Sequence, residues 1–167
     1  MKFLELNHKM RVVSFLLFLI SGWSIAACYL PDTFKAADKA VLISDVSLPK
    51  SEWTVFNLWA AWCAPCRAEL PILDKVAQSE KHPFTIFALN LNDGEAVAKE
   101  IFGDLKIEHL APMSTAETDL LSKLDVIGLP YTAILYQQKI IAEKNGILNA
   151  NDISAIDAFI NCYKGNQ

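Results

Sequence analysis

A pair of cysteines lies where a strand pattern gives way to a helix pattern. The run Val55–Trp62 is apolar and rich in β-branched and aromatic residues, which is typical of a buried strand. Beyond Cys66 the apolar residues recur at helical spacing, at Leu70, Leu73, Val76 and Ala77. The sequence therefore predicts a strand that leads through Cys63-Ala64-Pro65-Cys66 into a helix.

The N-terminus of a helix favours negative charge, because its backbone N–H groups are unpaired and its macrodipole is positive there. A cysteine at that place ionises more readily to the reactive thiolate. We expect Cys63, at the exposed turn, to attack a partner disulfide and Cys66, one helical turn further in, to resolve the mixed disulfide. Pro65 suits the first turn because its missing N–H would have no partner there, and it stiffens the loop.

A Cys-x-x-Cys segment can also supply half of a zinc site or attach haem. A structural zinc site needs four ligands, but the sequence has no second Cys-x-x-Cys, and His8, His82 and His109 are far apart. Arg67 rather than histidine follows Cys66, so the haem-attachment pattern is not met. Disulfide exchange is therefore the favoured interpretation, and we expect no metal and no cofactor.

Two segments resemble a known family. Phe56–Pro71 resembles the active-site segment of TlpA-like thioredoxin-fold proteins, which are membrane-tethered, extracytoplasmic thiol–disulfide oxidoreductases of bacteria, including members that serve cytochrome c maturation. Ile127–Thr132 resembles the family's cis-proline loop, which faces the cysteine pair and helps to hold the substrate peptide. The resemblance spans about residues 40–163 and implies an α/β thioredoxin fold, with a central mixed β-sheet flanked by helices. It also implies a cis Leu129–Pro130 bond.

The resemblance implies that Trp62, Pro65, Leu129 and Pro130 contact the substrate. An alternative role for Trp62, as for Trp59, is packing that shields the sulfurs.

Proton transfer is the role that the resemblance implies for Glu69, which follows Cys66 by one helical turn. Partial burial would raise the pKa of its carboxyl and make it a usable proton shuttle. A solvated glutamate on the helix surface is the alternative. Asn57 stands where cytosolic thioredoxins carry a buried aspartate. Since asparagine is neither acid nor base, any such role is expected to fall to Glu69.

The first 30 residues have the pattern of a membrane-targeting segment. Lys2, Lys9 and Arg11 precede an apolar run from Val12 to about Leu30. The run is just long enough to span a bilayer, and the positive charge before it favours a cytoplasmic N-terminus. We therefore expect the rest of the chain on the extracytoplasmic, periplasmic side of a bacterial envelope.

Cys28 leaves two alternatives open. Ile25-Ala26-Ala27-Cys28 resembles a bacterial lipobox, in which the cysteine is lipidated, and the other alternative is an uncleaved signal anchor. Both would tether the domain to the membrane. A Cys28–Cys162 disulfide is disfavoured, because it would draw the anchor residue from the membrane. Cys162 is expected to be an inert, small apolar residue.

The pattern divides the chain into a targeting segment (residues 1–30), a linker and N-terminal extension (31–52) and one thioredoxin-like domain (53–165). Alternation of strand and helix patterns suggests a mostly parallel sheet. Residues 31–50 are expected to hold an irregular strand pair. The other predicted elements are strands at Phe84–Asn90, Thr132–Tyr136 and Lys139–Ala142 and helices at Asp93–Phe102 and Thr115–Leu124. A terminal helix is expected to begin at a cap, Asn151 or Asp152, and to bury Ile153, Ile156, Ile160 and Tyr163.

The net charge of −4 argues against a nucleic-acid partner, and the sequence has no phosphate-binding glycine-rich loop. The expected function is a thiol–disulfide oxidoreductase that reduces disulfides of partner proteins. An oxidising direction is an open alternative, because the sequence does not give the reduction potential of the cysteine pair. By resemblance, a membrane electron donor would recharge it, and apocytochrome c is the leading candidate substrate. The alternative is a redox-inactive binding or holdase-like module in which the Cys63–Cys66 disulfide is structural.

Overall fold

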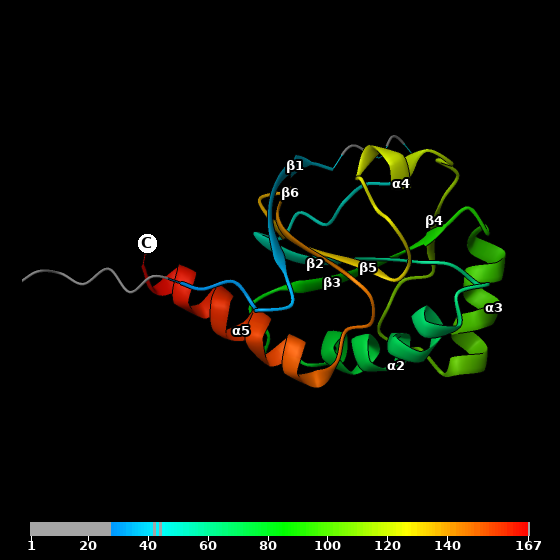
Figure 1. Ribbon diagram of the computed structural model, residues 1–167. Coiled ribbons are helices and arrows are strands. Elements are labelled where there is room, and N and C mark those ends of the chain that lie inside the picture. Colours follow the sequence, from blue (N-terminus) through cyan, green and yellow to red (C-terminus); the bar gives the residue numbers. More distant parts are fainter. Residues whose placement is uncertain (1–27, 42, 44, 167) are drawn as a thin grey trace, which may run out of the picture.

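The computed structural model describes residues 28–41, 43 and 45–166 (Figure 1). Most of the predicted targeting segment lies outside these residues, and within them no helix is long and apolar enough to cross a membrane. The elements follow in the order β1 (Lys35–Ala40), β2 (Trp53–Trp59), α2 (Ala64–Gln78), β3 (Thr85–Leu91), α3 (Glu95–Leu105), β4 (Met113–Thr115), α4 (Leu120–Lys123), β5 (Tyr131–Tyr136), β6 (Lys139–Asn145) and α5 (Ala150–Gly165).

One mixed sheet forms the centre of the domain, with the strand order β1-β6-β5-β2-β3-β4. The pairs β2–β3 and β3–β4 are parallel, whereas β1–β6, β6–β5 and β5–β2 are antiparallel. The mixed sheet implied by the family resemblance is confirmed, and the mostly parallel sheet inferred from alternation is wrong. A tight hairpin explains one of the three antiparallel pairs: Gln137 and Gln138 have φ angles of 49° and 66°, which suit the two-residue turn that joins β5 to β6.

Both faces of the sheet are covered, so every residue of β2 is buried. Val55 and Trp59 belong to the cluster that the sheet forms with α2, α3 and α5, while Phe56 and Leu58 face the cluster that includes α4. Figure 1 shows α2 and α5 on one side of the sheet and α4 on the other. The period of two in β2 thus distributes its apolar side chains between two cores.

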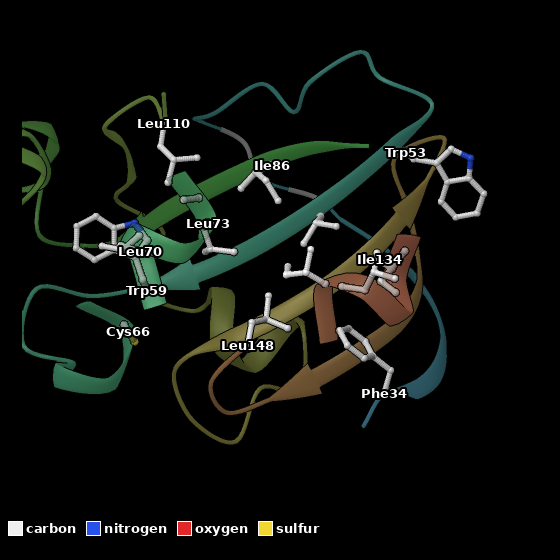
Figure 2. Packing of buried hydrophobic residues seen from close by; sticks show 14 of the residues in the cluster. Phe34, Trp53, Trp59, Cys66, Leu70, Leu73, Ile86, Leu110, Ile134 and Leu148 are labelled. Carbon is white, nitrogen blue, oxygen red and sulfur yellow. The ribbon is translucent and has the colours of Figure 1, made fainter. Parts of the chain in front are cut away.

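Aromatic side chains mark the two ends of β2. Trp53 lies at the start of the strand and packs edge-on against Phe159 and Tyr163 of α5, with ring centroids 6.1 Å and 5.1 Å away. Trp59 lies at the other end and stacks on Phe102 of α3. Figure 2 shows Trp59 near Leu70 and Cys66, with Trp53 at the opposite end of the strand. The cysteine pair therefore follows the end of β2 that is remote from this part of α5.

The predicted helix at Thr115–Leu124 is mostly wrong. Met113–Thr115 forms edge strand β4, and only Leu120–Lys123 is helical. Thr115 accepts a hydrogen bond from Asn92 N at its carbonyl oxygen and donates its hydroxyl to Asp45. These contacts fix an extended backbone, so tertiary pairing overrides the local helical pattern.

The N-terminal extension contributes one strand instead of the predicted strand pair. β1 pairs with β6, and its register shifts between Ala36 and Lys39. The irregularity was predicted, but the partner strand comes from the far end of the chain.

Helix α5 begins earlier than predicted. Its N-cap is Asn149, whose side chain accepts from the backbone N–H groups of Asn151 and Asp152. Asp152 in turn accepts from the Asn149 backbone N–H, so the two residues form a reciprocal capping box. The predicted cap residues therefore lie inside the first turn. Ile153, Ile156 and Ile160 are buried, as predicted.

Cys28 and Cys162 form a disulfide, with Cα atoms 5.7 Å apart. The prediction that disfavoured this bond is wrong, and so is the inert role expected for Cys162. The physical reason is that the fold begins before residue 31: Cys28 and Leu30 pack against the core, and Phe34 is buried within it. Lipidation of Cys28 would need the same sulfur atom, so the disulfide and lipidation are mutually exclusive.

Loss of this disulfide is expected to destabilise the domain, because the bond joins residues 134 positions apart. The C28S/C162S variant should lose about 4–5 kcal/mol in the free energy of unfolding, the loop-entropy value for a ring of this size. Denaturant unfolding of wild type and variant without reductant measures the loss. Excess reductant is the control, since it should bring the two proteins to similar midpoints. Equal midpoints without reductant would contradict the prediction.

Candidate active site

Cys63 and Cys66 form a disulfide at the N-terminus of α2, with Cα atoms 5.3 Å apart. Cys63 is the N-cap residue, and its Sγ accepts a hydrogen bond from Cys66 N at 3.2 Å. Pro65 lies in the first turn, where its lack of an N–H leaves no carbonyl unpaired. The strand, cysteine pair and helix are thus arranged as the sequence predicts.

Cys63 was expected to be exposed at the turn, but the structure buries both cysteines within a turn that is otherwise exposed. Trp62 is 72% exposed, and Ala64 and Pro65 are exposed as well, but Cys63 itself is only 4% exposed and Cys66 is fully buried. The turn is therefore open while its sulfurs are nearly covered. Of the two cysteines, Cys63 is the one that retains access to solvent.

The Leu129–Pro130 bond is cis, which confirms the prediction. The antiparallel register pairs Leu58 with Tyr131, the first residue of β5, so Pro130, directly before that strand, lies beside the carboxyl end of β2 that leads to the cysteines. Leu129 is half-buried and packs against the cluster that contains Cys63 and Cys66. The structure therefore brings the two sequence motifs to the same end of the sheet.

The side chains expected to contact substrate are not equally accessible. Trp62 and Pro65 are exposed, but Leu129 is half-buried and Pro130 is buried. Ile127, two residues before Leu129, is 90% exposed and was not singled out by sequence reasoning as a contact residue. Ile127 begins the segment that resembles the cis-proline loop, and this position could have identified it as a candidate contact residue.

Glu69 is fully buried in α2, so the alternative of a solvated glutamate is excluded. Its Oε1 accepts from Asn57 Nδ2 at 2.7 Å, and its Oε2 accepts from Leu148 N at 2.8 Å. Burial raises the pKa of the Glu69 carboxyl to about 7, although both hydrogen bonds favour the ionised form. Glu69 can therefore gain or lose a proton near neutral pH.

Asn57 holds the carboxyl of Glu69 against the sheet. It is fully buried in the middle of β2, and its Nδ2 also donates to Thr132 Oγ1 at 3.1 Å. Thr132 lies directly opposite Asn57 on β5. Position 57 is the one at which cytosolic thioredoxins carry an acid. Here it holds an asparagine that donates a hydrogen bond to the acid on α2, Glu69.

An ion pair lies near this carboxyl. Lys144 Nζ contacts Asp152 Oδ2 at 2.6 Å, and both side chains are largely buried. The positive charge of Lys144 lowers the pKa of Glu69, and the negative charge of Asp152 raises it. Because the two charges oppose each other, desolvation dominates the proton affinity of Glu69.

Asp93 supports the loop before Cys63, a role that sequence reasoning did not assign. Its Oδ2 accepts from Ala61 N at 2.7 Å and from Asn90 Nδ2 at 2.8 Å. Asn90 lies in β3, and Asp93 follows the end of that strand. Polar residues at the carboxyl end of a strand parallel to β2 were a usable signal, since such ends meet at one edge of the sheet.

Within the part of the chain that the structure describes, no group of three or more histidine, cysteine, aspartate or glutamate side chains is placed to hold a metal ion. The cysteine pair therefore has no potential metal ligands grouped around it there.

Residues 30–159 match the Redoxin family. The chain is 31% identical over 107 residues to the thiol:disulfide interchange protein DsbE of Pseudomonas aeruginosa, covering 64% of this chain and 57% of the relative. It is 26% identical over 96 residues to the thioredoxin-like protein YneN of Bacillus subtilis, covering 56% of each. The chain thus spans less than two thirds of the length of these curated relatives.

Solved structures agree on the fold. A DsbF homologue from Corynebacterium diphtheriae has a TM-score of 0.57 at 21% identity, over 79% of this chain and 99% of the homologue. The exposed lipoprotein thioredoxin Etrx1 of Streptococcus pneumoniae has a TM-score of 0.55 at 19% identity, over 77% of this chain and 99% of that chain. The predicted thioredoxin fold is confirmed, and by the match over residues 30–159 the chain belongs to the Redoxin family.

Proposed function

We propose that the protein is a thiol–disulfide oxidoreductase that exchanges electrons with cysteines of partner proteins through Cys63 and Cys66. The observation that carries the proposal is the disulfide at the N-terminus of α2, beside a cis-proline segment and on the same helix as a buried glutamate. The relatives named as thiol:disulfide interchange proteins support it.

The exchange balances as a two-electron reaction. In the reduced protein, the Cys63 thiolate attacks a partner disulfide, which forms a mixed disulfide and releases one partner thiolate. Cys66 then loses its proton and attacks Cys63 Sγ, which re-forms the Cys63–Cys66 bond and releases the second partner thiolate. The partner is reduced and this protein is oxidised. The reverse sequence would oxidise a partner dithiol.

Glu69 is the proposed acceptor of the Cys66 proton. It lies one helical turn beyond Cys66, is buried in the same core and has a pKa of about 7. Ionised Glu69 takes the proton when Cys66 attacks, and neutral Glu69 returns it when the reaction runs backwards. Trp62, Pro65, Leu129 and Pro130 are the proposed substrate contacts, with the exposed Ile127 added to them.

We infer that the protein acts as a reductant on the extracytoplasmic side of a bacterial membrane, tethered by its N-terminal segment. The Cys28–Cys162 disulfide, which the proposed exchange does not use, favours an oxidising compartment. The basic residues and apolar run before residue 30 favour a signal anchor, since the sulfur of Cys28 is occupied. A membrane electron donor and, among substrates, apocytochrome c follow from the TlpA-like resemblance.

Replacement of the resolving cysteine should trap partners. In the C66S variant, mixed disulfides at Cys63 cannot be resolved by the protein itself, so adducts that are sensitive to reductant should accumulate. Mass spectrometry of these adducts identifies the partners. Apocytochromes with Cys-x-x-Cys-His segments would support a role in cytochrome c maturation.

The C63S/C66S variant is the control for trapping, because it keeps the fold but has no attacking thiol. The redox-inactive binding module predicts that partner capture survives C63S. No adduct that depends on Cys63, in cells that express the protein, would contradict the proposed exchange.

Glu69 should give the exchange rate a pH dependence. Since the ionised carboxyl accepts the proton, the rate of resolution by Cys66 should rise as the pH increases through about 7. In E69Q this rise should disappear, and the rate at pH 8 should fall by about 10²-fold, the lower end for general base catalysis. Stopped-flow tryptophan fluorescence with a model disulfide measures the rate.

A matched control is E100Q, which changes an exposed glutamate on α3 and should leave the profile unchanged. An E69Q profile that overlays the wild-type curve would remove Glu69 from the mechanism and leave the cysteines in place.

A further inference from the structure

Only one end of the Asn57 side-chain amide forms hydrogen bonds, although the whole side chain is buried. Nδ2 donates to Glu69 Oε1 and to Thr132 Oγ1. Oδ1 is buried without a hydrogen-bond partner. A buried acceptor without a partner is unfavourable, so this arrangement calls for an explanation.

A second buried asparagine shows the contrast. Asn90, on the neighbouring strand β3, donates through Nδ2 to Asp93 and accepts through Oδ1 from Ser114 Oγ and Asp93 N. Both ends of its amide are satisfied, which fixes a single orientation. Asn57 has no such constraint on its second end.

The hydrogen bonds of Glu69 decide where a proton can reside. Leu148 N donates to Oε2, and a backbone N–H cannot reverse its role, so Oε2 remains an acceptor in both charge states. The carbonyl oxygen of a neutral carboxylic acid is a better acceptor than its hydroxyl oxygen, so the N–H of Leu148 favours the proton on Oε1. That oxygen faces Asn57 Nδ2 at 2.7 Å, which would place two donors against each other.

A half-turn of the amide removes this conflict. Rotation about the last side-chain torsion exchanges Oδ1 and Nδ2, so Oδ1 would face Glu69 Oε1 and accept its proton. The Thr132 hydroxyl both donates and accepts, so it can follow the rotation by donating to Oδ1. In the observed orientation Oδ1 has no partner, and after the rotation the NH₂ group has none. The rotated state is therefore favoured only when Glu69 is neutral and its Oε1 donates.

We propose that Asn57 is a two-way hydrogen-bond partner of Glu69, which donates to the ionised carboxylate and, after a half-turn of its amide, accepts from the neutral acid. Asn57 is thereby a positioning residue: it holds Oε1 in place while the charge changes. Its use in thiol exchange rests on the proposed function of Glu69. An aspartate at position 57 would instead compete with Glu69 for the proton.

The other charges that act on Glu69 come from Lys144 on β6 and Asp152 on α5. They contact each other at 2.6 Å, and Asp152 also accepts from Thr33 Oγ1 and Asn149 N. Cys63 and Cys66, on α2 with Glu69, are joined in the disulfide. The experiment is therefore made on the oxidised protein, in which neither cysteine titrates.

Nuclear magnetic resonance of the oxidised full chain tests the rotation. The ¹⁵N–¹H signals of the Asn57 side-chain amide should move upfield as the pH falls from 8.5 to 5.5, because the NH₂ group loses both acceptors. Their midpoint should coincide with that of the ¹³Cδ signal of Glu69. The Asn90 amide is the internal control and should not follow that titration. Asn57 signals that stay at the hydrogen-bonded position while Glu69 titrates would overturn the proposal.

The E69Q variant gives a second, independent readout. In this variant the side-chain amide oxygen accepts from Leu148 N, so the NH₂ group must point at Asn57. The O–H of the neutral Glu69 carboxyl would point at Asn57 in the same way. The Asn57 signals of E69Q should therefore match those of the wild type at low pH and should not titrate. Signals that match the wild type at high pH would contradict the inference.

The N57L variant, whose side chain has the same branching and number of heavy atoms, separates positioning from packing. It removes a charge-assisted bond from the ionised form and a weaker one from the neutral form, so the Glu69 midpoint should rise by about one pH unit or less. If the titration midpoint of Glu69 is unchanged in a folded N57L variant, Asn57 contributes packing and does not position the carboxyl. If the Asn57 and Glu69 signals titrate together while the exchange rate is independent of pH, the amide rotation stands and the catalytic role of Glu69 falls.

Discussion

The buried carboxyl of Glu69 joins three parts of the fold that are remote in sequence. Its two oxygens accept hydrogen bonds from Asn57 in the central strand and from Leu148 in the loop that precedes α5, while its own backbone belongs to α2. Gly146, in the same loop, donates its backbone N–H to the carbonyl oxygen of Pro130. The helix that carries the cysteines, the strand before them and the cis-proline segment are thus held together around one side chain.

This burial has opposite consequences for stability and for chemistry. The pKa of Glu69 rises from 4.5 to about 7 on folding, so between these values the folded state binds a proton that the unfolded chain releases. The stabilisation is fully present below pH 4.5 and is lost as the pH rises through 7. The ionised form that accepts the Cys66 proton is therefore the form that the fold tolerates less well. A site of this kind gives up some stability at neutral pH for a usable base.

Local sequence patterns predicted the strand and helix that form the site. They failed where contacts between distant segments determine the backbone conformation or the burial of a residue. The change of period at Cys63 located the strand, the cysteine pair and the helix, because both elements bury continuous apolar faces. Burial of Glu69 was only one of two alternatives, since its donors Asn57 and Leu148 come from other segments. Thr115 was assigned to a helix because its extended backbone depends on Asn92 and Asp45. The resemblance supplied the cis bond before Pro130, which no periodicity indicates.

The second disulfide changes how force would pass through the domain. Among the described strands β1 is an edge strand that pairs with β6 alone, and residues 28–34 lead into it. Without the disulfide, a pull on that segment would be resisted first by the packing of Leu30 and Phe34 and by the Thr33–Asp152 hydrogen bond, and then by β1. The Cys28–Cys162 bond passes part of the load to α5, whose buried residues Ile156, Phe159 and Ile160 belong to the main core. A domain tethered at this end and bound to a partner at the other would therefore carry part of the tension through a helix whose inner face is buried in the main core.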